Sequence, residues 1–320
     1  MLFRSGDAMG SSLALCQYFN SKNHSATVVA PNEYPDFLRW LPGTEKVLLF
    51  DKQNKQAKRA ITNSDIIFLL DFNAIHRVGD DMAKTLEDYK NDFAMIDHHQ
   101  QPDAIATYLY SDTSICSTAQ MVYHFLDMLG DVADITKDIA TCLYTGIMTD
   151  TGSFRFRSTT AETNRIVAKL IEKGAENDKI HSNVYDSNSY NRLLLRGQAL
   201  TNLKILPEYK TAFITLSEKE KKKFHYKKGD TEGVVNYALS IDNIVFAAIF
   251  IEDEEQKIIK ISFRSKGSFS VNQFARSYFN GGGHDNAAGG KSELSLDATI
   301  EYFTTLLPNY KNELQQSYEK

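Results

Sequence analysis

The sequence predicts an α/β protein in which a parallel, helix-covered sheet is joined by a connecting helix to a smaller α/β domain. Helix and strand patterns alternate through the first half, and a breaker-poor stretch follows at residues 187–206. The chain has 320 residues, of which 42% are hydrophobic, so it is long enough for two domains that each bury a core. We therefore predict one domain over residues 1–186, a connecting helix over 187–206 and a second domain over 207–320.

The first half has the alternation that parallel sheets require. Small and apolar residues predict a helix over about residues 10–21. Short apolar runs predict four strands, at residues 26–30, 47–50, 66–70 and 93–96. From Ser117 the pattern becomes helical, because a capping residue precedes apolar residues at the spacing of a core-facing stripe.

In the second half, the stretch at 187–206 is rich in Asn, Arg and Leu and predicts the connecting helix. Three further strands are expected, at residues 211–216, 243–251 and 257–263, the last two as a pair. A lysine-rich helix over residues 219–223 is interpreted as a solvated face.

Hydrophobic patterning and cysteine content indicate the cellular compartment of the protein. No apolar run approaches the ~18 residues of a membrane span, and we expect no signal peptide. The three cysteines, Cys16, Cys116 and Cys142, are odd in number and widely spaced, which favours a reducing compartment. We therefore expect a cytoplasmic protein.

Six acidic or histidine residues lie next to predicted helices or strands: Asp7, Asp71, Asp97, His98, His99 and Asp150. Two of the predicted strands end at these residues, and open α/β sheets bind ligands at the carboxyl ends of their strands. One such acid alone is more often a helix cap or turn residue, but several in order predict a site. Carboxylate oxygens with imidazoles suit Mn²⁺ or Mg²⁺.

These motifs resemble a known family. Asp97-His98-His99, with Gly6-Asp7-Ala8 before it and Thr149-Asp150-Thr151-Gly152 after it, is similar to the DHH phosphoesterase superfamily. The glycine-rich segment at residues 281–290 resembles the signature of the DHH-associated substrate-binding domain. Length and domain order look most like the nanoRNases, the branch of bifunctional oligoribonucleases and 3′-phosphoadenosine 5′-phosphate (pAp) phosphatases.

The resemblance implies a site with two Mn²⁺ ions, Mg²⁺ being an alternative, and attack on phosphorus by a metal-bound hydroxide. It implies four metal ligands, Asp7, Asp71, His98 and Asp150. It also implies that Asp71 bridges the metals and that His99 faces the phosphate as hydrogen-bond donor or proton carrier. Asp97 is expected to orient the metal-binding imidazole.

Substrate binding is expected in the second domain. Six residues are implicated: Arg264, Ser265, Gly281, Gly282, Gly283 and His284. Consecutive glycines let the backbone approach a phosphate and offer N–H groups to it, and Arg264 could hold a terminal phosphate bidentately. The alternative is a surface arginine beside a structural glycine turn. The formal net charge of −5 argues against long duplex DNA, so short single-stranded RNA or pAp is the expected partner. The resemblance also suggests a homodimer.

The N-terminus departs from the family pattern His-x-Asn/Ser-Pro-Asp-x-Asp-Ala. Alignment of its last acid on Asp7 places Met1 at the histidine and Ser5 at the first aspartate. Two ligands of the other metal are therefore missing. We expect the chain to be truncated at its N-terminus, which leaves the activity of this chain open; the upstream genomic sequence would test this.

The expected function is Mn²⁺-dependent hydrolysis of very short RNA to 5′-mononucleotides, with removal of the 3′-phosphate of pAp. One alternative is a RecJ-like single-strand exonuclease, although such enzymes usually carry additional domains for long strands, for which we expect no room in this chain. Others are a linear or cyclic dinucleotide phosphodiesterase and, as a non-enzyme, a degenerate nucleotide-binding module. A DHH-type pyrophosphatase is disfavoured because its second domain lacks the glycine motif.

Overall fold

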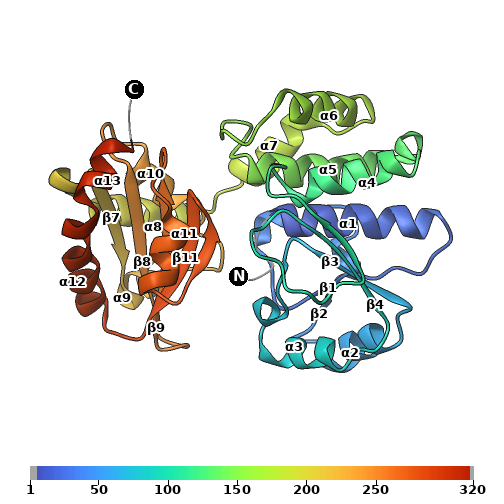
Figure 1. Cartoon of the computed structure of the whole chain (residues 1–320), viewed down its shortest axis with the longest axis horizontal. Helices are drawn as coiled ribbons and strands as arrows, with labels where there is room; N and C mark the ends of the chain where they lie inside the picture. The colour runs from blue at the N-terminus through green and yellow to red at the C-terminus, as the bar shows by residue number, and fades with distance from the viewer. Residues whose placement is uncertain (1–5, 318–320) are drawn as a thin grey trace. The chain divides into compact units, whose positions relative to one another are not determined.

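The computed structural model describes residues 6–317, which form two compact units (Figure 1). The first unit ends at Ser187 and the second begins at Asn188. Both units combine helices with a sheet, so the predicted α/β class is confirmed. The expectations placed on Met1 and Ser5 lie outside the described residues.

The first unit contains parallel strands. β3 (Ile66–Leu70), β4 (Asp92–Asp97) and β5 (Tyr108–Ser111) form one sheet in that order, and β1 (Val29–Ala30) pairs with β2 (Leu48–Leu49). The helices are α1 (Gly6–Ser21), α2 (Asn54–Thr62), α3 (Asp80–Glu87), α4 (Thr118–Met128), α5 (Lys137–Asp150), α6 (Ala161–Glu172) and α7 (Asn177–Tyr185). In Figure 1, α1, α4 and α5 lie on one side of these strands, and α2 and α3 lie on the other.

Most elements of this unit lie where the sequence predicts them. β3 matches the expected range, whereas β1 and β2 are shorter than the runs at 26–30 and 47–50. α1 begins at Gly6, earlier than expected, so Asp7 lies in its first turn. β5 was not predicted, because its side chains are exposed or half-buried and form no continuous apolar run.

Two glycines allow α1 and α5 to pack backbone against backbone. A Cβ atom on Gly10 would lie 2.4 Å from the carbonyl oxygen of Cys142 and 2.9 Å from the nitrogen of Gly146. A Cβ atom on Gly146 would lie 2.5 Å from the Cβ of Ala119 and 3.1 Å from Oδ1 of Asp7. No side chain fits at either position, so the first turns of α1 are held directly against α5.

The second unit has a six-stranded mixed sheet in the order β10-β11-β9-β8-β7-β6. Its strands are β6 (Lys204–Leu206), β7 (Thr211–Leu216), β8 (Phe246–Asp253), β9 (Ile258–Ser265), β10 (Gly282–His284) and β11 (Ala287–Ser292). Only the β7–β8 pair is parallel. The helices are α8 (Tyr190–Thr201), α9 (Glu218–Lys223), α10 (Val234–Leu239), α11 (Val271–Tyr278), α12 (Leu296–Leu306) and α13 (Lys311–Gln316). None of the helices in residues 6–317 is long and apolar enough to cross a membrane.

The expected connecting helix differs from the observed one. α8 covers only Tyr190–Thr201, and residues 204–206 form strand β6 instead. Leu195 and Ala199 of α8 are buried in one cluster with apolar residues of β7 and α10, so the helix is part of the second unit. The side chain of Asn202 donates to the carbonyl of Thr215 at 2.9 Å, where the chain leaves the helix.

The lysine-rich helix α9 is not wholly a solvated face. Lys221 is buried, and its ammonium group donates to Glu218 and to the carbonyl of Glu252, both at 2.7 Å. Lys222 and Lys223 are exposed, as expected. The charge pattern alone did not show that one lysine of the run faces strand β8.

We predict opposite effects on stability for two glycine substitutions, one inside the contact between α1 and α5 and one outside it. Gly10→Ala should destabilise the protein by about 1–3 kcal/mol, because the added methyl group meets backbone atoms of α5. Gly197→Ala is the matched control in α8, where no atom lies within 4 Å of the added Cβ. It should stabilise the protein by about 0.5–1 kcal/mol, since alanine favours helices. Thermal unfolding followed by circular dichroism measures both, and an unchanged midpoint for Gly10→Ala would contradict the described packing.

Candidate metal centre

The parallel strands β3 and β4 place acids at the same edge of the sheet. Leu70 pairs with Ile96 in register, so Asp71 follows β3 next to Asp97, the last residue of β4. Asp71 has a φ of 61°, a left-handed conformation that aspartate tolerates better than most residues. Its N–H group donates to the carbonyl of Ile96 at 3.4 Å. The two strand ends are thereby tied together.

Asp7 joins this edge from the first turn of α1. Its carboxylate is fully buried and accepts the first two N–H groups of α4, from Thr118 at 2.7 Å and from Ala119 at 2.8 Å. These N–H groups have no partner within their own helix, and the helix dipole favours a negative charge there. The Thr118 hydroxyl also donates to Oδ1 of Asp71 at 3.4 Å. Sequence reasoning identified Ser117 as a helix start but not α4 as part of the site.

His98 lies among three carboxylates. Its Nε2 atom is 3.7 Å from Oδ2 of Asp7, 3.5 Å from Oδ1 of Asp71 and 3.5 Å from Oδ2 of Asp150. Its Nδ1 atom lies 3.2 Å from the carbonyl oxygen of Ile115. Because a carbonyl only accepts, Nδ1 carries a proton, and Nε2 faces the acids. The four expected metal ligands are therefore gathered at one place.

The charges of this cluster are unbalanced. Burial raises the pKa of Asp7 well above its usual range, and the charges of Asp71 and Asp150 raise it further. Burial would lower the pKa of His98, but a hydrogen bond to Asp71 and the nearby carboxylate charges raise it to about 10. One imidazolium among three carboxylates leaves excess negative charge in a poorly solvated place, which a divalent cation would neutralise.

The donor atoms also suit a metal ion by their spacing. Asp7, Asp71 and His98 each offer one ligand atom within 4.8 Å of the others, and so do Asp71, Asp97 and His99. Carboxylate oxygens with imidazole nitrogens are typical ligands of hard or intermediate divalent ions. The residues present therefore fit a divalent cation.

Asp97 forms hydrogen bonds with His99, whereas we expected it to orient His98. Its Oδ1 atom lies 2.7 Å from Nδ1 of His99, and its Oδ2 accepts the backbone N–H of His99 at 2.8 Å. We expected Asp97 to orient the metal-binding imidazole, His98, but the carbonyl of Ile115 does this instead. The physical reason is local, because an aspartate readily accepts from the N–H two residues later.

A buried asparagine fixes the backbone that follows β4. Nδ2 of Asn73 donates to the carbonyls of His99 and Gln100, at 3.1 and 3.0 Å, and Oδ1 accepts from Arg77 at 3.2 Å. The loop after β3 is thus joined to the loop after β4. Sequence reasoning missed Asn73, since nothing in its local pattern distinguishes it from a turn residue.

In the second unit, the amides of Gly281 and Gly283 already have partners. The N–H of Gly281 donates to the carbonyl of Ala275 at 3.2 Å, and that of Gly283 donates to Oδ1 of Asn272 at 3.0 Å. A Cβ atom on Gly281 would lie 2.0 Å from the carbonyl oxygen of Gly289. These two glycines permit the close approach of β10 to β11. Both N–H groups are thus donated within the second unit, and the binding of a phosphate by the glycine motif stays a prediction.

The other expected substrate residues lie on β9 and β10, the two strands that flank β11 in this sheet. Arg264 is half-buried near the end of β9 and donates to the carbonyl of Phe263 at 2.9 Å. The buried Ser265 hydroxyl donates to the carbonyl of Phe269 and accepts from the side chain of Asn286, so it stabilises this part of the second unit. The remaining two, Gly282 and His284, are half-buried in β10.

Arg276 of α11 was missed by sequence reasoning. Its Nε atom donates to Oδ1 of Asn272 at 3.1 Å, and a Cβ atom on Gly282 would lie 3.6 Å from the same Nε. Asn272 therefore contacts both Arg276 and the glycine motif through one oxygen. Arg276, which is exposed, therefore lies beside Gly282 of β10.

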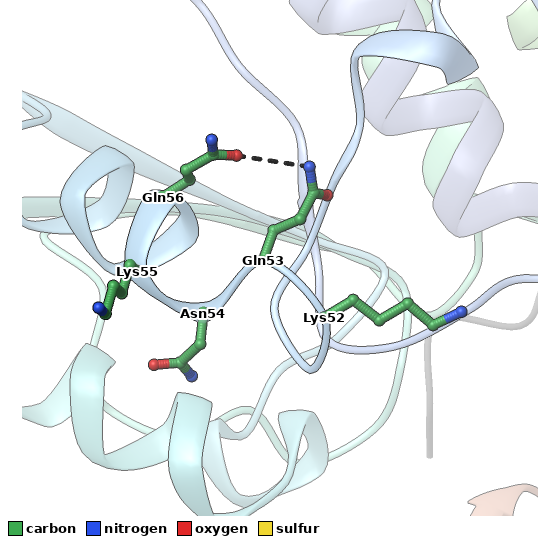
Figure 2. A pocket seen from close by; sticks show the side chains of 5 residues that line it. All are labelled: Lys52, Gln53, Asn54, Lys55 and Gln56. Atoms are coloured by element: carbon green, nitrogen blue, oxygen red, sulfur yellow. Dashed lines mark hydrogen bonds between the residues drawn. The ribbon is translucent and has the colours of Figure 1, made fainter.

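A surface hollow of about 440 Å³ lies in the first unit at the start of α2 (Figure 2). It is lined by Lys52, Gln53, Asn54, Lys55 and Gln56. Within it, Nε2 of Gln53 donates to Oε1 of Gln56 at 3.4 Å. We call the group formed by Asp7, Asp71, Asp150 and His98 the acid cluster. The hollow shares no residue with it and has no carboxylate or imidazole in its lining, so we assign it no function.

Carboxylates and imidazoles at the carboxyl edge of a parallel sheet, together with a separate glycine-motif domain, are typical of metal-assisted hydrolases. Residues 4–147 match the N-terminal domain of the DHH family, and residues 209–307 match the DHHA1 domain. The chain belongs to the DHH family, and it is a hydrolytic phosphoesterase.

Named relatives cover most of the chain. A bifunctional oligoribonuclease and PAP phosphatase NrnA from Thermus thermophilus is 32% identical over 92% of this chain and 84% of its own length. A probable enzyme of the same name from Streptococcus mutans is 28% identical over 89% and 86%. The crystal structure of an exopolyphosphatase-related protein from Bacteroides fragilis is 40% identical, with a TM-score of 0.92 over 98% of this chain and 91% of that one.

The hydrogen bonds of the Asp-His-His triplet predict different roles for Asp97 and His98. Asp97→Asn keeps the shape of the side chain but removes the charge beside His99, so hydrolysis should fall by about 10- to 100-fold while Mn²⁺ binding persists. His98→Asn should abolish Mn²⁺ binding, because Nε2 is the nitrogen that faces the carboxylates. Isothermal titration with Mn²⁺ measures this directly. Equal loss of Mn²⁺ in both variants would make Asp97 a metal ligand.

Proposed function

We propose that the protein hydrolyses very short RNA to 5′-mononucleotides and removes the 3′-phosphate of pAp with Mn²⁺ as cofactor. The observation that carries this proposal is the convergence of Asp7, Asp71, Asp150 and His98 at the end of β3 and β4. The names of the relatives from Thermus thermophilus and Streptococcus mutans support the substrate class. A short substrate also suits a chain of net charge −5, which lacks the cation density for long nucleic acids.

In this proposal Asp7, Asp71, His98 and Asp150 hold the metal. When bound, a divalent cation supplies a water that ionises near neutral pH and positive charge beside the phosphorus. The N–H groups of Thr118 and Ala119 hold the Asp7 carboxyl group in place, and the hydrogen bond from Ala119 opposes the rise in its pKa that burial causes. Ile115 directs Nε2 of His98 toward the acids.

His99 is the proposed proton carrier. Asp97 accepts from its Nδ1, so Nε2 is the nitrogen that would donate a hydrogen bond or a proton to the substrate phosphate when the ring carries two protons. Asn73 fixes the backbone carbonyl of His99 and thereby the position of the ring.

Substrate binding is assigned to Arg264, Gly282 and His284 of the second unit. Arg264 offers a planar fork of N–H donors that matches a terminal phosphate. Gly282 lies beside Arg276, since a Cβ atom on it would be 3.6 Å from Nε of that residue. Ser265 supports Arg264 from the next position of β9 through its buried hydrogen bonds.

The proposed function is tested by incubating the protein with Mn²⁺ and four substrates. They are a 5′-labelled RNA dinucleotide, pAp, a long single-stranded DNA and a cyclic dinucleotide. Hydrolysis of the dinucleotide and pAp, abolished by EDTA, is the expected result. Degradation of the long DNA alone would favour the RecJ-like alternative, and cleavage of the cyclic dinucleotide alone a signalling phosphodiesterase. Nucleotide binding without any hydrolysis would favour the degenerate binding module.

Removal of one arginine should separate substrate binding from metal binding. Arg264→Ala should raise KM for pAp by about 10- to 100-fold, because a charge-assisted contact to phosphate is lost. The Kd for Mn²⁺ should stay unchanged, since Arg264 lies outside the acid cluster. Arg165→Ala, on the exposed face of α6, is the control for loss of a surface arginine. Weaker Mn²⁺ binding in the Arg264 variant would contradict this division of roles.

A further inference from the structure

The turn that follows Asp150 has an unusual backbone. Gly152, Ser153 and Phe154 have φ angles of 56°, 61° and 63°, so three successive residues are left-handed. For residues with a Cβ atom this conformation costs roughly 1–2 kcal/mol each. Such residues persist only where the surrounding structure imposes them, and they concentrate at functional sites.

Side chains from α5 and α7 impose this turn. Nδ1 of His181 donates to the carbonyl of Asn177 at 2.8 Å, so its Nε2 accepts from the Ser153 hydroxyl at 3.1 Å. The Phe154 ring packs against Tyr144 and His181, with ring centroids 5.6 and 6.3 Å apart. The turn is therefore a rigid element of the first unit.

An aromatic side chain and two arginines follow Asp150 in the turn, at residues 155–157. The N–H groups of Arg155 and Phe156 both donate to the carbonyl of Thr151, at 3.0 and 3.1 Å, and Thr151 directly follows Asp150. Phe156 is 46% exposed although it is a large apolar side chain. Arg155 and Arg157 on either side of it are also exposed.

The Phe156 ring packs against the backbone of Gly152. A Cβ atom on Gly152 would lie 2.4 Å from the ring, so the ring rests on the glycine backbone. Nε of Arg155 donates to the carbonyl of Gly152 at 2.8 Å, which fixes the neighbouring guanidinium as well. The ring is thus both positioned and partly exposed, so a flat ligand that stacks on it would lose less free energy to ordering of the side chain.

We propose that Arg155, Phe156 and Arg157 form a nucleotide-binding platform, on which a substrate base stacks against Phe156 while the arginines contact backbone phosphates. This inference rests on the proposed function for its choice of ligand. Single strands are bound by aromatic side chains combined with cations, and stacking tolerates any base. The two arginines also offset the repulsion that the carboxylates of the site exert on phosphates.

The test compares two ligands that differ only in the base. One is a 5′-phosphorylated dinucleotide containing 2-aminopurine, and the other is its abasic analogue. Both are titrated against the metal-depleted protein, the first by fluorescence and the second by competition. The variants are Phe156→Leu, Phe156→Tyr and Arg157→Gln, with Tyr108→Leu as the control for loss of an aromatic residue that is 59% exposed on β5.

Phe156→Leu should weaken binding of the 2-aminopurine dinucleotide by about 5- to 50-fold and leave the abasic analogue unchanged. Phe156→Tyr should restore binding, because it retains the ring. Arg157→Gln should weaken both ligands alike, and Tyr108→Leu neither. The platform is refuted if Phe156→Leu weakens both ligands equally or neither. A change of subunit number in Phe156→Leu without a change in nucleotide affinity would assign the ring to a protein contact and also refute it.

Hydrolysis of the unmodified dinucleotide by the wild-type protein with Mn²⁺ is measured alongside. Binding that depends on Phe156 without any hydrolysis would support the platform and refute the proposed function. Hydrolysis by the wild type with unchanged binding in Phe156→Leu would refute the platform alone. The two proposals therefore fail in different experiments.

Discussion

The buried carboxylate of Asp7 joins the start of α1 to the start of α4, and the arrangement of the site depends on this contact. A fully buried charge is unfavourable unless hydrogen bonds compensate it, and the N–H groups of Thr118 and Ala119 provide them. The same contact brings Thr118 within reach of Asp71 at the end of β3. One acid thus supports two helices and lies beside the strand end that supplies the next acid.

The close packing of α1 on α5 serves the same arrangement. Gly146 faces both Ala119 and Asp7, so a larger residue there would displace the carboxylate as well as the helices. α5 ends at Asp150, the third carboxylate around His98. Packing and charge are therefore coupled, since the contact that holds the helices together also sets the distances between like charges.

Continuous apolar strands were the features most easily predicted from sequence. Residues 66–70 and 211–216 match β3 and β7, because both are unbroken apolar or β-branched runs with polar neighbours. The gathering of Asp71 and His98 follows from parallel strand ends. The partner of Asp97 could not be predicted, because its spacing allows either imidazole. Nor could the pairing of the Gly281 and Gly283 amides, which depends on how α11 packs beside β10.

The role of Asn73 has a consequence for the chemical ageing of the protein. Its amide nitrogen serves two carbonyl oxygens at once, those of His99 and Gln100. Deamidation would replace these donors with a carboxylate oxygen that can only accept, so three oxygens would face one another. It would also add a negative charge beside a cluster already rich in carboxylates. A single spontaneous loss of ammonia at this position would thus separate the two loops on which the imidazoles and Asp71 are carried.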